Sequence, residues 1–354
     1  MITISLCMIV RDEEEVLARC LESVQGIADE IIVVDTGSKD RTPEIARQFT
    51  EQVFSFPWVD DFAAARNFSF SKARMDYILW LDADDVLEEG DRAEFLRLKE
   101  ELDPSADVVM LPYHIAFDEA GRPAFTYERE RLLKRERGFR WQGAVHEVIV
   151  PAGKVVRASA SVSHRKMKAG DPDRNLRIFE QLLARGEKLD PRQQYYYARE
   201  LAAHGRDREA AGWFTGFLDR EDGWIENKIG ACLDLAGCYR RLGEPSRALA
   251  ALTRSFAFGL PRPEICCALG EDFLEAGRIP EAVCWYQAAR HCPPPSAEGF
   301  CQPDYWDFIP CVQLCVCYDR MGDRERALRY HEKAKRLKPE NPSVLYNERY
   351  FSGQ

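Results

Sequence analysis

The chain has 354 residues, of which 45% are hydrophobic and 31% charged, a composition typical of a globular protein with two domains. Its formal net charge of −10 argues against a nucleic-acid partner, because such binding depends on basic side chains that neutralise phosphates. No run of 18 apolar residues occurs, which argues against an integral membrane segment. The N-terminus lacks the basic start of a signal peptide, and the twelve cysteines then predict a reducing, cytoplasmic location.

Apolar runs and helical periodicities alternate along the first half of the chain. Runs typical of strands occupy residues 3–10, 30–35, 52–56, 77–81, 106–111 and 155–164. Helical spacing or a helix-start signal is found at 13–24, 42–49, 62–73 and 91–102. Residues 117–127 predict a β-hairpin, after which Arg131 and Arg135 either face an anionic donor or lie on a solvated strand face. The alternation predicts βαβ units, so we expect an α/β fold with a mixed, mainly parallel sheet.

Acidic residues directly follow two of these apolar runs. Asp35 ends the second run, and Asp82, Asp84 and Asp85 follow the fourth. Ligands of parallel sheets bind at the carboxyl ends of the strands, so these side chains should share one rim. On an extended segment Asp82 and Asp84 would point the same way and suit one Mg²⁺ or Mn²⁺ ion completed by phosphate oxygens. The alternatives are an acidic helix start and, for Asp35, a carboxylate that caps its own turn.

Four segments, in their order and spacing, resemble family 2 glycosyltransferases. They are SLCMIVRDEE at 5–14, IVVDTGS at 32–38 followed by Asp40 and Thr42, Ala65-Arg66-Asn67, and LWLDADD at 79–85. The resemblance covers roughly the first half of the chain. It implies a GT-A fold over residues 1–168, a nucleotide-sugar donor that we expect to carry UDP, and a divalent ion, Mn²⁺ or Mg²⁺.

The same resemblance implies roles for individual residues. Those expected to bind the nucleotide sugar are Arg11, Glu13, Asp35, Thr36, Gly37, Ser38, Arg66, Asp82 and Ala83. Among them Asp35 would read the base and Asp82 would hold the ribose or sugar. Arg66 would approach the diphosphate, and its alternative is a solvated helix residue paired with Asp60 or Asp61. Many family members have Tyr-Asn-Glu where this chain has Arg-Asp-Glu, so this loop lacks an aromatic ring to stack on the base.

The end of the first half supplies the expected base and a metal ligand. Glu147 best matches the family's general base, which takes the acceptor's proton during attack on the anomeric carbon, and His146 is the runner-up. The alternative for this pair is an ion pair or hydrogen bond that closes a hairpin. Asp84 and His164 are expected to ligate the metal ion. An imidazole beside a carboxylate favours Mn²⁺ over Mg²⁺.

Strand signals cease in residues 169–354, which are predicted to form paired helices. Four pairs share a glycine that ends the first helix, with an alanine five positions later, and these glycines are Gly205, Gly243, Gly277 and Gly322. Gly243 and Gly277 lie 34 residues apart, which is the tetratricopeptide period, and insertions lengthen the other intervals. This half therefore resembles a tetratricopeptide array, whose stacked helices form a concave groove. Cysteines at apolar helical positions here are expected to be buried thiols rather than zinc ligands.

Together, the resemblances imply a metal-dependent, inverting glycosyltransferase that moves a sugar from a UDP-sugar to Cys, Ser or Thr of a peptide or protein. This architecture is similar to that of bacterial enzymes that glycosylate ribosomally made peptides. The repeats would hold the acceptor, or alternatively form a homodimer. A second alternative is a cell-envelope glycan or lipid-linked acceptor, and a third is a non-catalytic, peptide-binding scaffold. The joint presence of the predicted site residues argues against the scaffold, while the sugar and the acceptor residue stay open.

Overall fold

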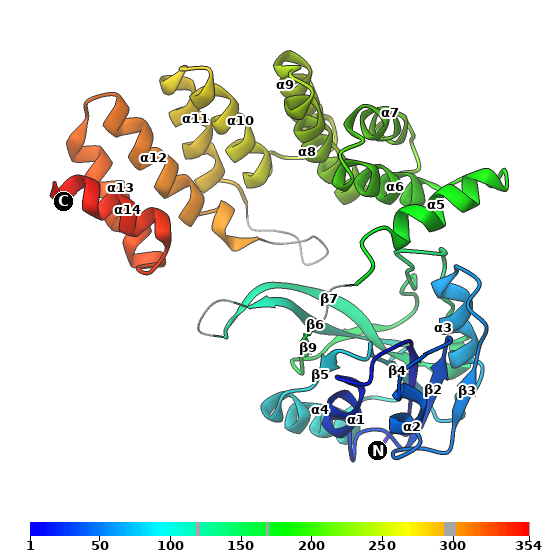
Figure 1. The fold of residues 1–354 in the computed structure, drawn as a ribbon. Helices are drawn as coiled ribbons and strands as arrows, with labels where there is room; N and C mark the ends of the chain where they lie inside the picture. Colours follow the sequence, from blue (N-terminus) through cyan, green and yellow to red (C-terminus); the bar gives the residue numbers. More distant parts are fainter. Residues whose placement is uncertain (118–120, 168–169, 294–301, 354) are drawn as a thin grey trace. The chain divides into compact units, whose positions relative to one another are not determined.

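The computed structural model describes residues 1–117, 121–167, 170–293 and 302–353 (Figure 1). It divides into two compact units, of which the first comprises residues 1–186 and the second begins at Glu187. Each unit has its own buried apolar clusters and is described by itself. The domain boundary expected after Lys168 stays a prediction, since residues 168–169 lie outside the described residues.

The first unit is built around one sheet. Its strands are β1 Ile4–Val10, β2 Glu30–Asp35, β3 Val53–Ser55, β4 Tyr77–Trp80, β5 Asp85–Val86, β6 Val108–Phe117, β7 Pro123–Lys134, β8 Val155–Arg157 and β9 Val162–His164. They lie in the spatial order β3-β2-β1-β4-β7-β6-β9-β5, with β8 beside β6. β1 is parallel to β2 and β4, and β3 is parallel to β2, whereas β7 joins β4 antiparallel. The expected α/β fold with a mixed, mainly parallel sheet is confirmed.

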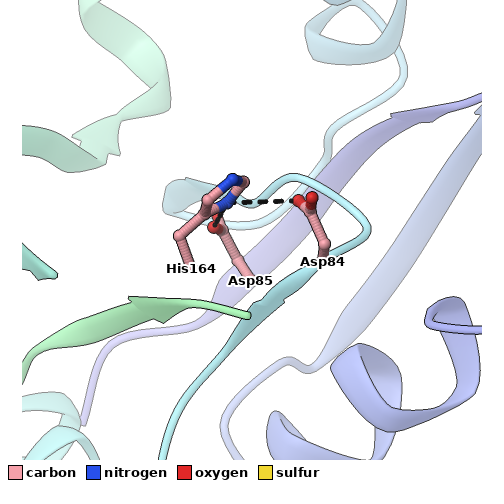
Figure 2. A group of neighbouring side chains, drawn as sticks. All are labelled: Asp84, Asp85 and His164. Carbon is pink, nitrogen blue, oxygen red and sulfur yellow. Dashed lines mark hydrogen bonds and ion pairs between the residues drawn. The ribbon is translucent and has the colours of Figure 1, made fainter. Parts of the chain in front are cut away.

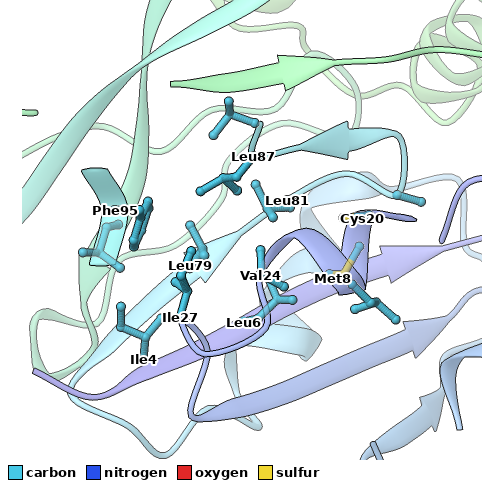
Figure 3. Packing of buried hydrophobic residues seen from close by; sticks show 14 of the residues in the cluster. Ile4, Leu6, Met8, Cys20, Val24, Ile27, Leu79, Leu81, Leu87 and Phe95 are labelled. Atoms are coloured by element: carbon cyan, nitrogen blue, oxygen red, sulfur yellow. The ribbon is translucent and has the colours of Figure 1, made fainter. Parts of the chain in front are cut away.

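Helices cover both faces of this sheet because its central strands are apolar on both sides. These helices are α1 Leu17–Ser23, α2 Thr42–Ala46, α3 Phe62–Phe70 and α4 Glu89–Glu101, and a further helix of this unit is α5 Arg174–Ala184. Leu79 packs with residues of α1 and α4, among them Phe95, in the cluster of Figure 3. Its neighbours Ile78 and Trp80 point to the opposite face and pack with α3 and Trp141. A continuous apolar run is therefore what a strand covered on both faces requires.

The strands near the acidic segment differ from the expectation. The fourth strand ends at Trp80, and Asp85 begins a separate two-residue strand that pairs antiparallel with β9, opposite His164. The single strand expected over 155–164 is two short strands, β8 and β9. The expected hairpin is formed by β6 and β7, and its turn at 118–120 lies outside the described residues.

The second unit consists of helices that pack in successive pairs along the chain. They are α6 Pro191–Ala203, α7 Asp207–Leu218, α8 Ile225–Arg241, α9 Pro245–Arg254, α10 Pro263–Glu275, α11 Ile279–Arg290, α12 Phe308–Arg320, α13 Arg324–Leu337 and α14 Pro342–Ser352. Each helix from α6 to α13 packs against its pair partner. The four predicted glycines follow the first helix of each pair with φ between +70° and +78°, a conformation that favours glycine at a helix end. The tetratricopeptide-like organisation is confirmed.

Two further expectations concern the whole chain. Within the described residues, none of the helices is both long enough and apolar enough to cross a membrane. The cysteines expected to be buried thiols are free and inaccessible, and they are Cys266, Cys267, Cys311, Cys315 and Cys317. They pack among apolar side chains of the repeats, as small hydrophobic residues do.

Candidate active site

The loops that follow β1 and β2 are joined by hydrogen bonds at the rim of the sheet. The Asp12 backbone N–H donates to Ser38 Oγ over 2.9 Å, and the Glu13 backbone N–H donates to Thr42 Oγ1 over 2.7 Å. Asp12 has a φ of +55°, and its carboxylate accepts from the Lys39 backbone N–H. Thr42, the first residue of α2, thus holds the loop after β1 through its hydroxyl. The predicted nucleotide-binding residues of the two loops thus lie beside one another.

Within this pair of loops, Asp35 caps its own turn. Its carboxylate accepts from the backbone N–H groups of Gly37 at 3.3 Å and Ser38 at 3.1 Å. Thr36 is buried, and its hydroxyl donates to the Val10 carbonyl at 3.1 Å. The capping alternative is therefore present, while recognition of a base by Asp35 stays a prediction. Arg11 is exposed at the edge of the same loops.

The acidic segment after β4 forms a tight turn instead of an extended strand. The Asp85 backbone N–H donates to the Asp82 carbonyl at 3.1 Å, and the Asp82 backbone N–H donates to Asp85 Oδ2 at 3.0 Å. The expectation that Asp82 and Asp84 point the same way is wrong, because the turn sends the two carboxylates to different partners. Ala83 lies between them with its side chain buried in the apolar cluster.

Arg66 joins two of the predicted site residues. Its Nη2 donates to Asp82 Oδ1 at 2.7 Å, and its Nε donates to Glu147 Oε1 at 2.6 Å. The Arg66 side chain is only 9% exposed, and its guanidinium lies over the rings of Trp80 and Trp141 at 5.2 and 4.8 Å. The alternative of a solvated Arg66 paired with Asp60 or Asp61 is wrong.

The charges of this bridge stabilise one another. Burial opposes the Arg66 charge, but the Asp82 and Glu147 carboxylates outweigh it and raise the Arg66 pKa above its ordinary value. Burial also opposes ionisation of Asp82, yet Arg66 and Arg131 lower the pKa of that carboxyl to about 2. Asp82 is therefore a carboxylate at any physiological pH. Glu147, with 12% of its side chain exposed, takes part in an ion pair, but its partner is Arg66 of α3 and not a residue that closes a hairpin.

Arg66 is positioned by α3, whose first turn is capped and which is hydrogen-bonded to the loop that contains Trp141. Asp61 caps the helix by accepting from the Ala64 backbone N–H at 2.8 Å. Asn67, next to Arg66, donates to the Trp141 carbonyl at 3.0 Å and accepts from the Trp141 backbone N–H at 2.9 Å. This two-way clamp explains why an asparagine follows the arginine in the sequence. The sequence reasoning assigned no role to Asn67 or Trp141.

The loop that carries Glu147 is closed by its own backbone. Gln142 and Val148 exchange two backbone hydrogen bonds of 2.9 and 3.0 Å, and the Phe62 backbone N–H at the start of α3 donates to the Ala144 carbonyl at 2.8 Å. His146 has a φ of +52°, and its ring stacks on Phe179 of α5 with centroids 6.4 Å apart. The Glu147 carboxylate, not the His146 ring, contacts Arg66. Their roles in catalysis stay predictions.

Asp84, Asp85 and His164 form a second cluster, from the turn and from the end of β9 (Figure 2). His164 Nδ1 lies 3.3 Å from Asp84 Oδ1 and 3.3 Å from Asp85 Oδ1. One ligand atom of each residue lies within 4.8 Å of the others. The structure thus brings the two predicted metal ligands together, and adds Asp85.

Asp85 is held from behind by a buried arginine. Asp85 and Arg131 are both fully buried, with Arg131 Nη1 3.0 Å from Asp85 Oδ2, and the Tyr113 hydroxyl donates to Asp85 Oδ1 at 2.8 Å. The Arg131 guanidinium lies between the rings of Trp80 and Tyr113, at 3.8 and 4.2 Å. Arg131 is therefore not on a solvated face. Arg135 is exposed and donates to the Met75 carbonyl.

The donor set of the second cluster fits a divalent ion. Two carboxylates and an imidazole are ligands that Mn²⁺ accepts readily, and Asp84 and His164 are each partly exposed. Burial would lower the pKa of His164, but its hydrogen bonds to Asp84 and Asp85 outweigh this and raise it to about 10. Because Asp85 already pairs with Arg131, Asp84 and His164 are the candidate ligands.

Comparison with known proteins agrees with both units. The family model for glycosyl transferase family 2 matches residues 5–162, and a tetratricopeptide repeat model matches residues 311–343. A TPR repeat-containing protein of Synechococcus elongatus is 42% identical over 153 residues, which are 42% of this chain and 36% of that protein. The SPbeta prophage-derived glycosyltransferase SunS of Bacillus subtilis is 27% identical over 223 residues, 59% of this chain and 51% of SunS.

Among solved structures, Pseudomonas aeruginosa pilF aligns with 50% of this chain and 73% of its own, with a TM-score of 0.39 and 14% identity, which is too low to support an assignment. The chain spans 36% and 51% of the lengths of the two curated relatives above. The family match covers most of the sheet, Arg66 with its partners Asp82 and Glu147, and Asp84, and it ends before His164. The chain thus carries a domain of glycosyl transferase family 2, joined to tetratricopeptide-like helical repeats.

Proposed function

We propose that the chain is a metal-dependent, inverting glycosyltransferase that moves a sugar from a UDP-sugar to a Cys, Ser or Thr side chain of a peptide. The observation that supports it most is the acidic turn itself. Its two carboxylates, Asp82 and Asp84, reach the Arg66–Glu147 pair on one side and His164 on the other. In this proposal Glu147 serves as the general base, Arg66 as the cation for the diphosphate, and Asp84 with His164 as the metal site, all around one turn.

The proposed reaction is a single displacement. The acceptor oxygen or sulfur forms a bond to the anomeric carbon while the bond from that carbon to the diphosphate oxygen breaks. The acceptor's proton passes to Glu147, and the electrons of the broken bond leave with the nucleoside diphosphate. Asp84 and His164 would hold the Mn²⁺ or Mg²⁺ ion, whose charge would stabilise this leaving group. Attack opposite the leaving group inverts the anomeric carbon.

Arg66 orients the proposed base. One oxygen of Glu147, Oε1, accepts from Arg66 Nε, so Oε2 is the atom that takes the acceptor's proton. The two bonds to Asp82 and Glu147 use two of the five N–H donors of the guanidinium. Its permanent charge next to Asp82 is suited to a diphosphate oxygen. Arg66 thus serves both the base and the leaving group in this proposal.

A peptide acceptor is supported by the second unit. Tetratricopeptide-like arrays present a concave surface that commonly accommodates extended chains, and this chain joins such an array to a transferase domain. This support is architectural, so the acceptor class is decided by assay. A homodimer formed through the repeats is the competing role, and size-exclusion chromatography with light scattering distinguishes it.

Release of nucleoside diphosphate tests the proposal. The purified full chain is incubated with UDP-glucose, UDP-N-acetylglucosamine or GDP-mannose, in MnCl₂ or in EDTA. We expect release from a UDP-sugar with Mn²⁺, none in EDTA, and none from Asp84→Asn. Glu100→Gln, an exposed carboxylate change on α4, is the control that keeps activity. No release from any donor, with no UDP binding by calorimetry, would favour a non-catalytic scaffold. Transfer to a lipid-linked sugar but to no peptide would identify a cell-envelope acceptor in place of a peptide.

A further inference from the structure

The second unit contains a cavity on the first helices of consecutive repeats. It has a volume of about 390 Å³ and is lined by residues of α8, α10 and α12, with Ala202 from α6, Tyr286 from α11 and Tyr305 from the short helix Pro303–Tyr305. α10 packs against both α8 and α12, so residues of all three helices can line one cavity. We call this cavity the acidic groove, defined by Asp234 of α8, Glu264 and Glu271 of α10, and the two tyrosines.

The arginines at the acidic groove are already engaged. Arg240 donates through Nε to Asp272 at 2.6 Å and through Nη2 to the Ala268 carbonyl at 2.8 Å. Arg241 donates to both carboxylate oxygens of Asp207, with a shortest distance of 2.6 Å. The two-point contact holds the Arg241 guanidinium in one orientation. Both arginines thus make their shortest contacts outside the three groove carboxylates, and Arg240 approaches Glu271 only at 3.6 Å.

Those carboxylates have weaker partners. Glu264 is half-buried and forms no ion pair within the described residues, and burial raises its pKa above the ordinary value. Asp234 has Arg199 at 3.4 Å, yet burial raises its pKa as well. Glu271 is 58% exposed and lies 3.6 Å from Arg240. Partly dehydrated carboxylates without full compensation favour the entry of a cation.

The remaining lining suits the stem of a long basic side chain. Tyr286 is buried, and a Cβ at Gly270 would lie 2.8 Å from its ring, so a glycine is needed there for the ring to pack. Tyr305 and Ile309 are half-buried and line the same space. Lysine and arginine place their methylene stems along apolar or aromatic surface while the charged head reaches a polar partner. Aromatic rings also attract such cations directly.

We propose that the acidic groove binds a lysine or arginine side chain of the acceptor polypeptide, and hence that the acceptor is a basic peptide. That the bound peptide is the acceptor rests on the proposed function. That the groove binds a basic side chain does not. The carboxylates contact the charged head, and Tyr305 and Ile309 contact the stem. The groove thereby selects acceptors by a residue away from the one that is glycosylated.

Fluorescence anisotropy with two synthetic probes tests the groove on the full chain. The probes are fluorescein-labelled peptides of glycine, serine and leucine that carry either three lysines or three glutamates at matched positions. We expect the lysine probe to bind and the glutamate probe not to bind. Glu264→Gln, which keeps the side-chain shape, should weaken binding of the lysine probe about tenfold, the range for a charged hydrogen bond. Glu221→Gln, an exposed carboxylate of the same unit outside the groove, should leave it unchanged.

Two results would overturn the inference. One is equal binding of both probes, and the other is equal loss in Glu264→Gln and Glu221→Gln, which would assign binding to overall negative charge. Tyr305→Ala should weaken binding of the lysine probe without any change of charge, which separates the effect of groove contacts from that of net charge. Donor hydrolysis distinguishes the two proposals: Glu264→Gln should hydrolyse the donor normally. Hydrolysis absent in the unaltered chain refutes the transferase, and lost probe selectivity with normal hydrolysis refutes only the groove.

Discussion

Replacing Arg131 by methionine should destabilise the first unit, because it leaves Asp85 buried without its cation. Both side chains are fully buried, and the Asp85 carboxylate would keep only the Tyr113 hydroxyl and the Asp82 backbone N–H as close donors, beside His164. Removal of one member of a buried ion pair typically costs about 3–5 kcal/mol. Methionine fills much of the space between the Trp80 and Tyr113 rings, so the loss of stability would come from the unpaired Asp85 charge rather than from a cavity.

The size of this loss is measurable by unfolding. For a unit of 150–250 residues, 1 kcal/mol corresponds to about 2–4 °C, so the melting temperature should fall by about 6–20 °C. Guanidinium unfolding gives the free energy, and hydrogen exchange of the β4 and β7 peptides assigns the change to the first unit. The matched control is Arg135→Met at an exposed position just after β7, which should change the free energy of unfolding by less than about 0.5 kcal/mol.

A double-mutant cycle decides whether the pair is responsible. Asp85→Asn alone leaves Arg131 buried without its anion and should also destabilise, whereas Arg131→Met with Asp85→Asn removes both charges. A buried pair replaced by neutral groups is often close to neutral in stability, so the double variant should recover about 2 kcal/mol or more relative to the sum of the single losses. Additive losses, or a loss below about 1 kcal/mol for Arg131→Met, would refute the reasoning.

Three further predictions concern the rim. Asp84→Asn should abolish Mn²⁺-dependent donor hydrolysis and weaken Mn²⁺ binding measured by electron paramagnetic resonance, while the melting temperature stays within about 3 °C, since Asp84 is partly exposed. Glu147→Gln should lower kcat for transfer by about 10² or more with donor KM retained. Arg66→Met should lower the free energy of unfolding of the first unit most near pH 7. The difference in this free energy between the variant and the unaltered chain should shrink below pH 4. The Asp82 pKa lies below its unfolded value, so its pairing stabilises above that value and is lost as pH falls toward 2. A pH-independent difference would exclude the Arg66–Asp82 pairing as its cause.

Local sequence was sufficient for the elements whose residues face the core on both sides. The run from Tyr77 to Leu81 is apolar at every position, and such a run fits a strand covered by helices on both faces. In the second unit the glycines with positive φ mark the helix ends, because few other residues adopt that conformation. Both signals arise from neighbours along the chain, which is why the order of elements could be predicted.

The pairings in the candidate site could not be predicted in this way. Arg66 and Glu147 are 81 positions apart, and Asp85 meets Arg131 and His164 from two other strands. Sequence alone did not distinguish a buried Arg131 from a solvated one, because its strand carries charged residues on both sides of it. The family resemblance named the individual residues, but the partner of each side chain required the sheet order that places β7 and β9 near the turn.

The acidic turn explains why its carboxylates differ in partner despite their closeness in sequence. Had the strand continued through Asp84, side-chain alternation would have placed Asp82 and Asp84 on one face. The buried Asp85 prevents this by accepting from the Asp82 backbone N–H and pairing with Arg131, which fixes the turn from inside. Asp82 then pairs with Arg66, while Asp84 approaches His164. The buried ion pair thus holds the proposed leaving-group site and the proposed metal site in a fixed relation, so Arg131→Met should weaken Mn²⁺ binding even though Arg131 contacts neither Asp84 nor a donor.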